Sequence, residues 1–326
     1  MLNSPPPKKM GGEGSIFKSI FIISWGLALL FMLVSIAIIY SGAWTAHFSQ
    51  LSYPYFFILL LEVPILPVSD VILIPAMFSM YILFFGIMVY YSFKWKGRGL
   101  LDNPVIFYGA MSAFALTVTV ILTLILEGAN IPIGGSSLTS LLNNHPFETY
   151  LSLIYAPFAE ETGFRLIPLG IMSVLLLSRY HPEKLDYLKA FFIPGHMRKK
   201  YNQKFGYIEY AMIAATSILF AYAHVAYGLW SWGKIITVLP VAVVLAVGFL
   251  KFGIYMDVPI HWLFNGFSTV YILNGALTEG AGFALFYELI AGFAAIVFLL
   301  ILYRKWDKRR NAIRSENIHE INRQET

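Results

Sequence analysis

Three short groups of polar residues, each inside an apolar stretch, carry the side chains that could do chemistry in this sequence. The first group holds Glu160, Glu161 and Arg165, the second holds His224, and the third holds His261 and Asn265. An ionisable side chain in a membrane-spanning helix costs about 2.5–3.5 kcal/mol on insertion scales, so such residues are functional candidates. We therefore take these positions as the candidate site.

Helical spacing places some of these side chains on common faces. Glu161 and Arg165 are four residues apart, so they can pair along one face, and Glu160 points about 100° away from that face. His261 and Asn265 are also four residues apart and share a face. The alternatives are structural: an ion cluster that locks helices for Glu161 and Arg165, a packing role for His224, and hydrogen bonds between helices for His261 and Asn265.

The chemistry that these groups could perform is hydrolysis. A carboxylate and an imidazole can together deprotonate a water molecule. A second histidine and an asparagine can donate hydrogen bonds to a developing oxyanion. No serine, threonine or cysteine nucleophile is needed, and the sequence contains no cysteine, which also excludes thiolate metal sites and disulfides.

The three motifs, in this order, resemble those of the CPBP family, which comprises CAAX proteases and bacteriocin-processing enzymes of the Abi group. The family pattern is EExxxR, FxxxH and HxxxN on separate transmembrane helices. The chain has EETGFR at 160–165, FAYAH at 220–224 and HWLFN at 261–265. The resemblance covers about residues 148–275.

This resemblance implies a glutamate-dependent intramembrane endopeptidase that acts on a prenylated or membrane-embedded peptide. It makes Glu160 the base that activates water, with His224 beside it, and assigns the oxyanion to His261 and Asn265. It gives supporting roles to Glu161, Arg165 and Phe220, the first two holding the helix and the third packing. It requires no cofactor.

Other functions are compatible with the same residues. Zinc could be held by Glu160, His224 and His261, but Asn265 is a poor zinc ligand, so we favour a metal-free site. A non-catalytic scaffold or immunity protein would keep the fold and tolerate loss of Glu160. A proton-coupled transporter would relay protons through Glu160, His224 and Glu288, although we find no internal repeat of the kind common in transporters.

The composition shows which elements must position these residues. Of the 326 residues 58% are hydrophobic and 13% are charged, against about 45–50% and about 25% in a typical soluble domain. The net charge of +5 comes from basic residues in short loops, which indicates membrane topology rather than nucleic-acid binding. We expect an all-α, polytopic protein of the cell membrane.

Apolar runs of about 20 residues predict transmembrane helices. Eight runs qualify or nearly qualify: Ile16–Tyr40, Val71–Phe93, Val105–Leu126, Tyr150–Leu177, Tyr207–Tyr227, Ile235–Leu250, Pro259–Ala276 and Phe283–Tyr303. The stretch Phe48–Pro67 is apolar but rich in proline, so we expect it to be irregular or interfacial.

With eight spans, nearly all lysines and arginines fall on one side, and the loops 41–70 and 127–149 contain none. The positive-inside rule then places both termini in the cytoplasm. We divide the chain into a cytoplasmic segment 1–15, a transmembrane domain 16–303 and a basic tail 304–326.

Straight helices would not bring the three motifs to one depth. Glu160 lies 19 residues before Arg179, whereas His261 lies only 10 residues after Lys251. At about 1.5 Å per residue, these two lie roughly 28 and 15 Å from the basic side. A shared site therefore requires broken helices or helices that extend beyond the bilayer.

Overall fold

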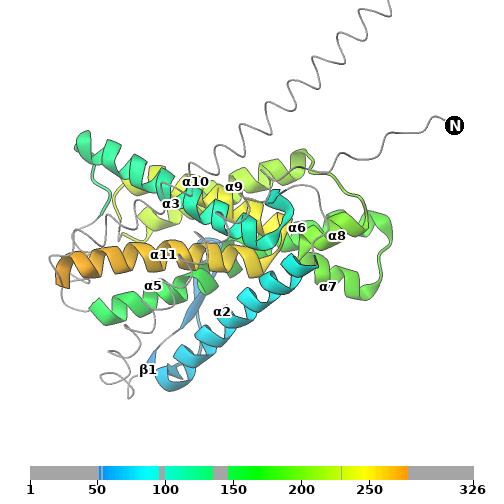
Figure 1. Ribbon diagram of the computed structural model, residues 1–326, viewed down its shortest axis with the longest axis horizontal. Helices are drawn as coiled ribbons and strands as arrows, with labels where there is room; N and C mark the ends of the chain where they lie inside the picture. Colours follow the sequence, from blue (N-terminus) through cyan, green and yellow to red (C-terminus); the bar gives the residue numbers. More distant parts are fainter. Residues whose placement is uncertain (1–50, 53, 95–99, 135–145, 229, 278–326) are drawn as a thin grey trace, which may run out of the picture.

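The computed structural model describes residues 51–52, 54–94, 100–134, 146–228 and 230–277 (Figure 1). The long helices are α2 (Asp70–Phe93), α3 (Pro104–Gly128), α5 (Pro146–Glu161), α6 (Ile167–Leu177), α9 (Tyr207–Ala226), α10 (Gly233–Lys251) and α11 (Ile254–Leu277). Shorter helical elements are η1 (Leu100–Asp102), η2 (Thr162–Leu166), η3 (Ser178–Tyr180), α7 (Lys184–Phe192) and α8 (Pro194–Lys200).

Five helical stretches of the described residues are long and apolar enough to cross a membrane. They are Ile72–Phe93, Pro104–Gly128, Ser152–Tyr180, Tyr207–Ala226 and Gly233–Lys251. They correspond to the second to sixth predicted spans, and α11 contains the seventh. The first and eighth predicted spans, and both termini, lie outside the described residues. Exposed apolar side chains on α2, such as Ile82 at 70% and Phe93 at 88%, fit contact with lipid.

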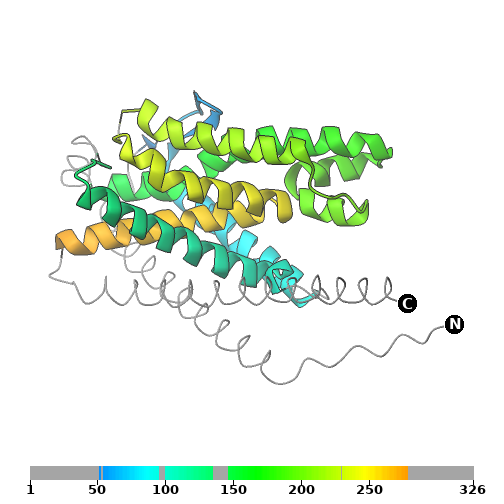
Figure 2. The same ribbon diagram turned by 90° about the horizontal axis from the view of Figure 1, so that it is seen from above.

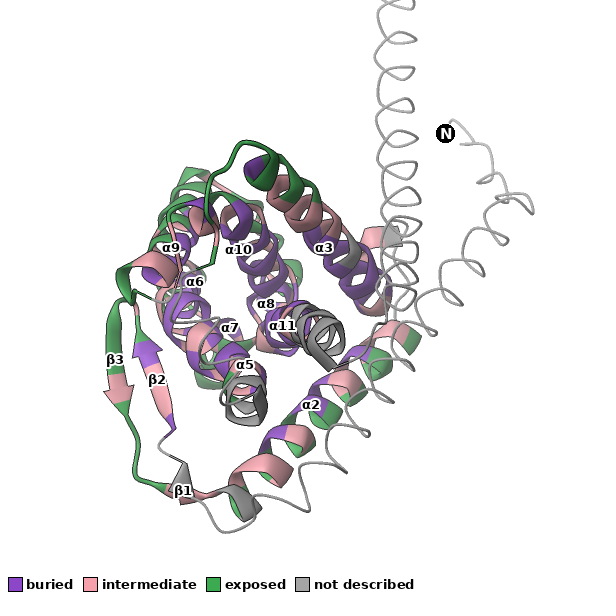
Figure 3. Ribbon diagram, turned by 90° about the vertical axis from the view of Figure 1, so that its left-hand side faces the viewer, coloured by how far each residue is buried: buried purple, intermediate pink, exposed green. Residues whose placement is uncertain are grey.

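Helices α10 and α11 lie inside the bundle, and the other helices surround them. Helix α11 packs along α5 and also contacts α2, α3 and α10, while α10 packs against α9 (Figures 1 and 3). Tyr81 of α2 stacks on Trp262 of α11 with ring centroids 4.4 Å apart, and both side chains are buried. Helix α11, which carries His261 and Asn265, is therefore held from several sides.

Strands replace the irregular segment that the prolines predict, so the chain is mostly helical rather than all-α. Strands β2 (Tyr55–Ile58) and β3 (Leu61–Pro64) form an antiparallel hairpin, and β1 (Leu51–Ser52) pairs with β4 (Val68–Ser69). Leu59 adopts a positive φ of 54° in the two-residue turn between β2 and β3. Alternation over four residues is too short to distinguish a strand from an irregular segment in sequence.

The hairpin lies against the helices that carry the first motif, with β2 on the inner side and β3 outside (Figure 3). Tyr155 of α5 donates a hydrogen bond of 2.6 Å from its hydroxyl to the Tyr55 carbonyl oxygen. Tyr227 donates one of 2.8 Å to the Leu60 carbonyl oxygen. These bonds satisfy backbone carbonyls that strand pairing leaves unpaired.

The helices extend to different levels at the basic end of the bundle. This difference explains why residue counts place Glu160 and His261 at different depths. Helix α10 ends at Lys251, and the chain turns back into α11 at Gly253, which has a positive φ of 116°. The end of α6 and the start of α9 extend past this turn (Figure 2). Lys251 and Arg179 therefore lie at different levels, and residue counts from them do not measure depth on one scale.

Candidate active site

The first motif lies at a break in its helix. Helix α5 ends at Glu161, one turn of π-helix covers Thr162–Leu166, and α6 continues from Ile167. The inserted turn changes the direction in which the following side chains point, and such turns are frequent at functional sites. Even so, Arg165 Nε lies 3.3 Å from Glu161 Oε2, and both side chains are fully buried. The predicted pair is present, although the helix between its members is not α-helical.

Close packing explains the glycine in this motif. A Cβ atom added at Gly163 would collide with the backbone of Phe57 in strand β2. The ring of the next residue, Phe164, lies 6.0 Å from the Phe57 ring. Glycine thus lets the hairpin approach the helix break.

His261 connects the two adjacent glutamates. Its Nδ1 lies 2.7 Å from Glu161 Oε1, and its Nε2 lies 3.7 Å from Glu160 Oε2. The first distance is a hydrogen bond, in which the ring Nδ1–H donates to the carboxylate, and the second is too long for one. Glu161 therefore orients the His261 ring so that Nε2 faces Glu160.

Glu160 differs from the rest of this cluster in its accessibility. Its side chain is 17% exposed, whereas those of Glu161 and His261 are 0% and 4% exposed. Among the described residues, no hydrogen-bond donor reaches its Oε2 atom. Glu160 is thus the carboxylate of the pair that a water molecule or a substrate can approach.

Phe220 holds several members of the site together. The Arg165 guanidinium carbon lies 4.0 Å from the centre of its ring. The rings of His224 and His261 both meet it edge-on, at centroid distances of 4.9 and 5.7 Å. The predicted packing residue therefore supports the arginine and fixes the spacing of the two histidines.

His224 and Asn265 each make a backbone hydrogen bond. His224 Nδ1 lies 2.9 Å from the Phe220 carbonyl oxygen, so Nδ1 carries the proton and Nε2 is the acceptor. Asn265 donates from Nδ2 to the Leu153 carbonyl oxygen at 2.9 Å, and this bond joins α11 to α5. The structure thus brings Glu160, Glu161, Arg165, Phe220 and His261 together, with His224 beyond Phe220 and Asn265 farther along α11.

A comparison with protein families now identifies this part of the chain. The model of the family described as type II CAAX prenyl endopeptidase, Rce1-like, matches residues 143–267. Residues 143–267 are thus similar to this family, and we call this part of the chain the Rce1-like domain. No curated protein and no solved structure matches the chain. The Rce1-like domain runs from before α5 to the middle of α11, so it contains all three motifs, and α2 and α3 lie outside it.

The Rce1-like domain contains two further site residues that the sequence analysis missed. Asp257 is fully buried on α11, and its carboxyl group interacts with that of Glu161. Asp257 lies four residues before His261, and this spacing in an apolar run was the available signal.

Lys234 is the second missed residue. It is the second residue of α10, its Nζ lies 3.6 Å from the centre of the Trp230 ring, and it interacts electrostatically with Glu160 and His224. The sequence shows it as one of two basic residues outside the basic loops. A cation therefore lies near the accessible glutamate of the Rce1-like domain.

The residues considered for zinc do not assemble as a metal site. In the described part of the chain, no three His, Cys, Asp or Glu side chains are placed to hold a metal ion together. Glu160 and His261 are neighbours, but each nitrogen of His261 faces a carboxylate and His224 Nδ1 is bonded to the backbone.

Proposed function

We propose that the protein is a glutamate-dependent intramembrane peptidase that cuts a prenylated or membrane-embedded peptide. One observation carries the proposal: the Glu160 side chain is 17% exposed against 0% for Glu161, and its Oε2 has no donor and lies 3.7 Å from His261 Nε2. A buried acceptor without a partner costs about 1–3 kcal/mol, and a bound water molecule or substrate group would remove that cost. The Rce1-like domain supports a CAAX-protease-like function in general.

In this mechanism Glu160 acts first as a base and then as an acid. It takes a proton from a water molecule while the water oxygen bonds to the carbonyl carbon of the substrate. The carbonyl π electrons move to the oxygen and form a tetrahedral oxyanion. The proton then passes from Glu160 to the amide nitrogen as the carbon–nitrogen bond breaks, which releases an acid and an amine and restores the carboxylate.

The histidines and Asn265 would assist these steps. His224 presents an acceptor Nε2 that can hold the second hydrogen of the water. His261, whose Nδ1–H is bonded to Glu161, would donate to the oxyanion from Nε2 when both ring nitrogens carry protons, and Asn265 would donate from its amide. Arg165 balances the charge of Glu161, so that Glu161 orients His261 without competing for the proton.

Lys234 gives the site a candidate group for recognising the end of the substrate. A CAAX-type substrate ends in a free carboxylate three residues beyond the scissile bond. A lysine beside Glu160 and His224 can pair with that carboxylate. We expect Lys234→Gln to lower the preference for a free-acid peptide over its amide about tenfold, since hydrogen bonds to charged groups contribute about 1.5–3 kcal/mol.

The rim of the site lies at the end of the bundle opposite the basic loops. His224 lies two residues before the end of α9, and Lys234 lies near the start of α10. Because the chain has no cysteine, single substitutions can test the side of the membrane. With cytoplasmic termini, Trp232→Cys should react with an impermeant maleimide on intact cells, and Lys204→Cys should react only after lysis.

The deciding experiment uses purified protein and a quenched, farnesylated CAAX peptide. Wild type should release the fluorophore, and Glu160→Gln should lose activity while it elutes as a folded protein. The matched control is Glu127→Gln, which changes an exposed glutamate at the C-terminal end of α3. It should retain activity. Equal cleavage by wild type and Glu160→Gln would refute the mechanism. No cleavage by either, with this peptide and with an unprenylated membrane peptide, would favour a non-catalytic scaffold.

A further inference from the structure

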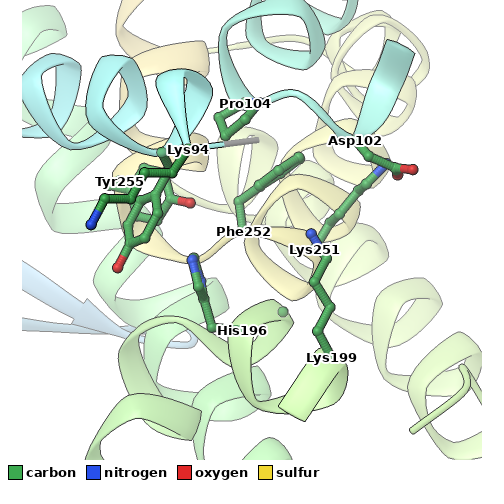
Figure 4. A pocket seen from close by; sticks show the side chains of 10 residues that line it. Lys94, Asp102, Pro104, His196, Lys199, Lys251, Phe252 and Tyr255 are labelled. Carbon is green, nitrogen blue, oxygen red and sulfur yellow. The ribbon is translucent and has the colours of Figure 1, made fainter. Parts of the chain in front are cut away.

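A hollow lies at the basic end of the bundle and contains none of the candidate active-site residues. Its volume is about 420 Å³, and it is bounded by the end of α2, the start of α3, helix α8 and the turn between α10 and α11 (Figure 4). Its polar lining includes Lys94, Lys199, Lys251, Asp102, His196 and Tyr255. We call it the basic pocket.

The charges of the basic pocket do not cancel. Lys251 is held by Asp102, with Nζ 2.9 Å from Oδ1, and it also donates to the Leu101 carbonyl oxygen at 2.6 Å. Among the described residues, no carboxylate lies within ion-pair distance of Lys94 or Lys199. Lys94 donates from Nζ to the Tyr90 hydroxyl rather than to an acid. Two lysines of the pocket lining thus have no neutralising carboxylate, an arrangement that attracts anions.

Two buried polar atoms in the wall of the pocket also lack partners. Tyr255 is 1% exposed, and its hydroxyl makes no hydrogen bond within the described residues. The same holds for Nδ1 of His196, whose ring packs 4.3 Å from the Tyr91 ring. Burial lowers the pKa of His196, and Lys199 lowers it further, so this ring is neutral at pH 7 and offers one donor and one acceptor. A ligand with several acceptor oxygens would satisfy these groups.

The place of the basic pocket indicates the source of such a ligand. It lies where α2 ends, at Phe93, and where α3 begins, at Pro104, which is where spanning helices leave the apolar layer. Tyrosine and lysine side chains are typical of this depth, and basic pockets between transmembrane helices bind lipid headgroups. We propose that the basic pocket binds the phosphate group of an anionic phospholipid.

Binding there would act on the first turn of α11. Tyr255 lies in the pocket, while Asp257 and His261, two and six residues farther along α11, belong to the Glu161 cluster. A headgroup bonded to Tyr255 would therefore brace the helix that positions His261. This gives a lipid a route to influence the active site without entering it.

The test counts lipids retained by the purified full-length protein in native mass spectrometry. Phosphatidylglycerol is the anionic probe and phosphatidylcholine the zwitterionic one. Wild type should retain phosphatidylglycerol at least tenfold more tightly. The double variant with Lys94→Gln and Lys199→Gln should bind phosphatidylglycerol roughly 30-fold more weakly. Lys184→Gln with Lys204→Gln removes the same charge from exposed positions outside the pocket and should stay within twofold of wild type.

Tyr255→Phe tests the pocket without changing its charge. It removes one donor and should weaken phosphatidylglycerol binding several-fold, with an unchanged elution volume on size exclusion. If both double lysine variants lose phosphatidylglycerol binding equally, general surface charge explains the binding and the proposal is overturned. Inorganic phosphate is the third probe. If it binds as tightly as the lipid, with the same dependence on Lys94 and Lys199, the ligand is a soluble phosphate and the lipid assignment is overturned.

Discussion

Glu161 and His261 are joined by a hydrogen bond of 2.7 Å, although 100 positions separate them in the chain. Arg165 contacts the other oxygen of Glu161, at 3.3 Å, and Asp257 interacts with the same carboxyl group. One buried carboxylate thus connects an arginine, a histidine and a second acid. Glu161 is therefore the centre of the cluster, and Glu160 is the member that faces outward.

This arrangement predicts unequal effects for the two buried acids. Glu161→Gln should destabilise the protein by about 3–5 kcal/mol, because it leaves the Arg165 charge buried without its counter-charge. Asp257→Asn should stay within about 1 kcal/mol of wild type, since an amide of the same size is neutral and can donate a hydrogen bond to the Glu161 carboxylate. Thermal unfolding of the two variants in one detergent measures the difference. Equal losses of stability in the two variants would show that the negative charge of Asp257 matters to the cluster.

The motifs indicated in advance which residues meet, but not how they bond. Glu161, Arg165 and His261 could be assigned to one site from spacing and from the family pattern. The bond from His261 to Glu161, rather than to Glu160, depends on how α5 is rotated against α11 and on where α11 begins. Both follow from tertiary packing, which no local sequence signal specifies. Asp257 was missed because it belongs to no motif, although its spacing from His261 matches that from His261 to Asn265.

Gly163→Ala tests the contact between the hairpin and the helix break. The added methyl group collides with the Phe57 backbone, so we expect a loss of about 1–3 kcal/mol and displacement of the hairpin. Limited proteolysis should then cut the hairpin faster, and peptide cleavage should fall. Gly86→Ala is the control, since a Cβ there has no atom within 4 Å. It should be neutral or stabilising by about 0.5–1 kcal/mol, because alanine favours a helix interior. Similar stability and proteolysis of the Gly163→Ala and Gly86→Ala variants would show that Gly163 is not needed for this contact.

Asp186 provides a prediction on pH outside the membrane spans. Its carboxylate accepts hydrogen bonds from Lys200 Nζ and from the Tyr201 hydroxyl, both at 2.6 Å, and these bonds lower its pKa. A lowered pKa means that the stabilisation is fully present above the unfolded value of about 3.9 and is lost as pH falls through the folded value. The bonds should therefore hold α7 to α8 at neutral pH and weaken below about pH 4.

Hydrogen exchange across residues 184–201 can check this. Wild type should be better protected than Asp186→Asn at pH 6–7, and the difference should shrink below about pH 4. Glu183→Gln changes an exposed neighbouring acid that makes no hydrogen bond to Lys200 and should behave as wild type. A difference that stays constant down to pH 3 would assign the effect of Asp186→Asn to packing.

Asn265 has two roles to separate, because its amide nitrogen is bonded to Leu153 in this structure. If Asn265 only joins α11 to α5, Asn265→Ala should cost about 1 kcal/mol of stability and leave kcat nearly unchanged. If it also stabilises the oxyanion, kcat should fall about 10²–10³-fold while KM changes little, because the interaction strengthens only in the transition state. We expect the second result. Measuring kcat, KM and unfolding on the same preparation distinguishes the two, and Asn265→Asp, which keeps the size but loses the amide donors, should reproduce the fall in kcat.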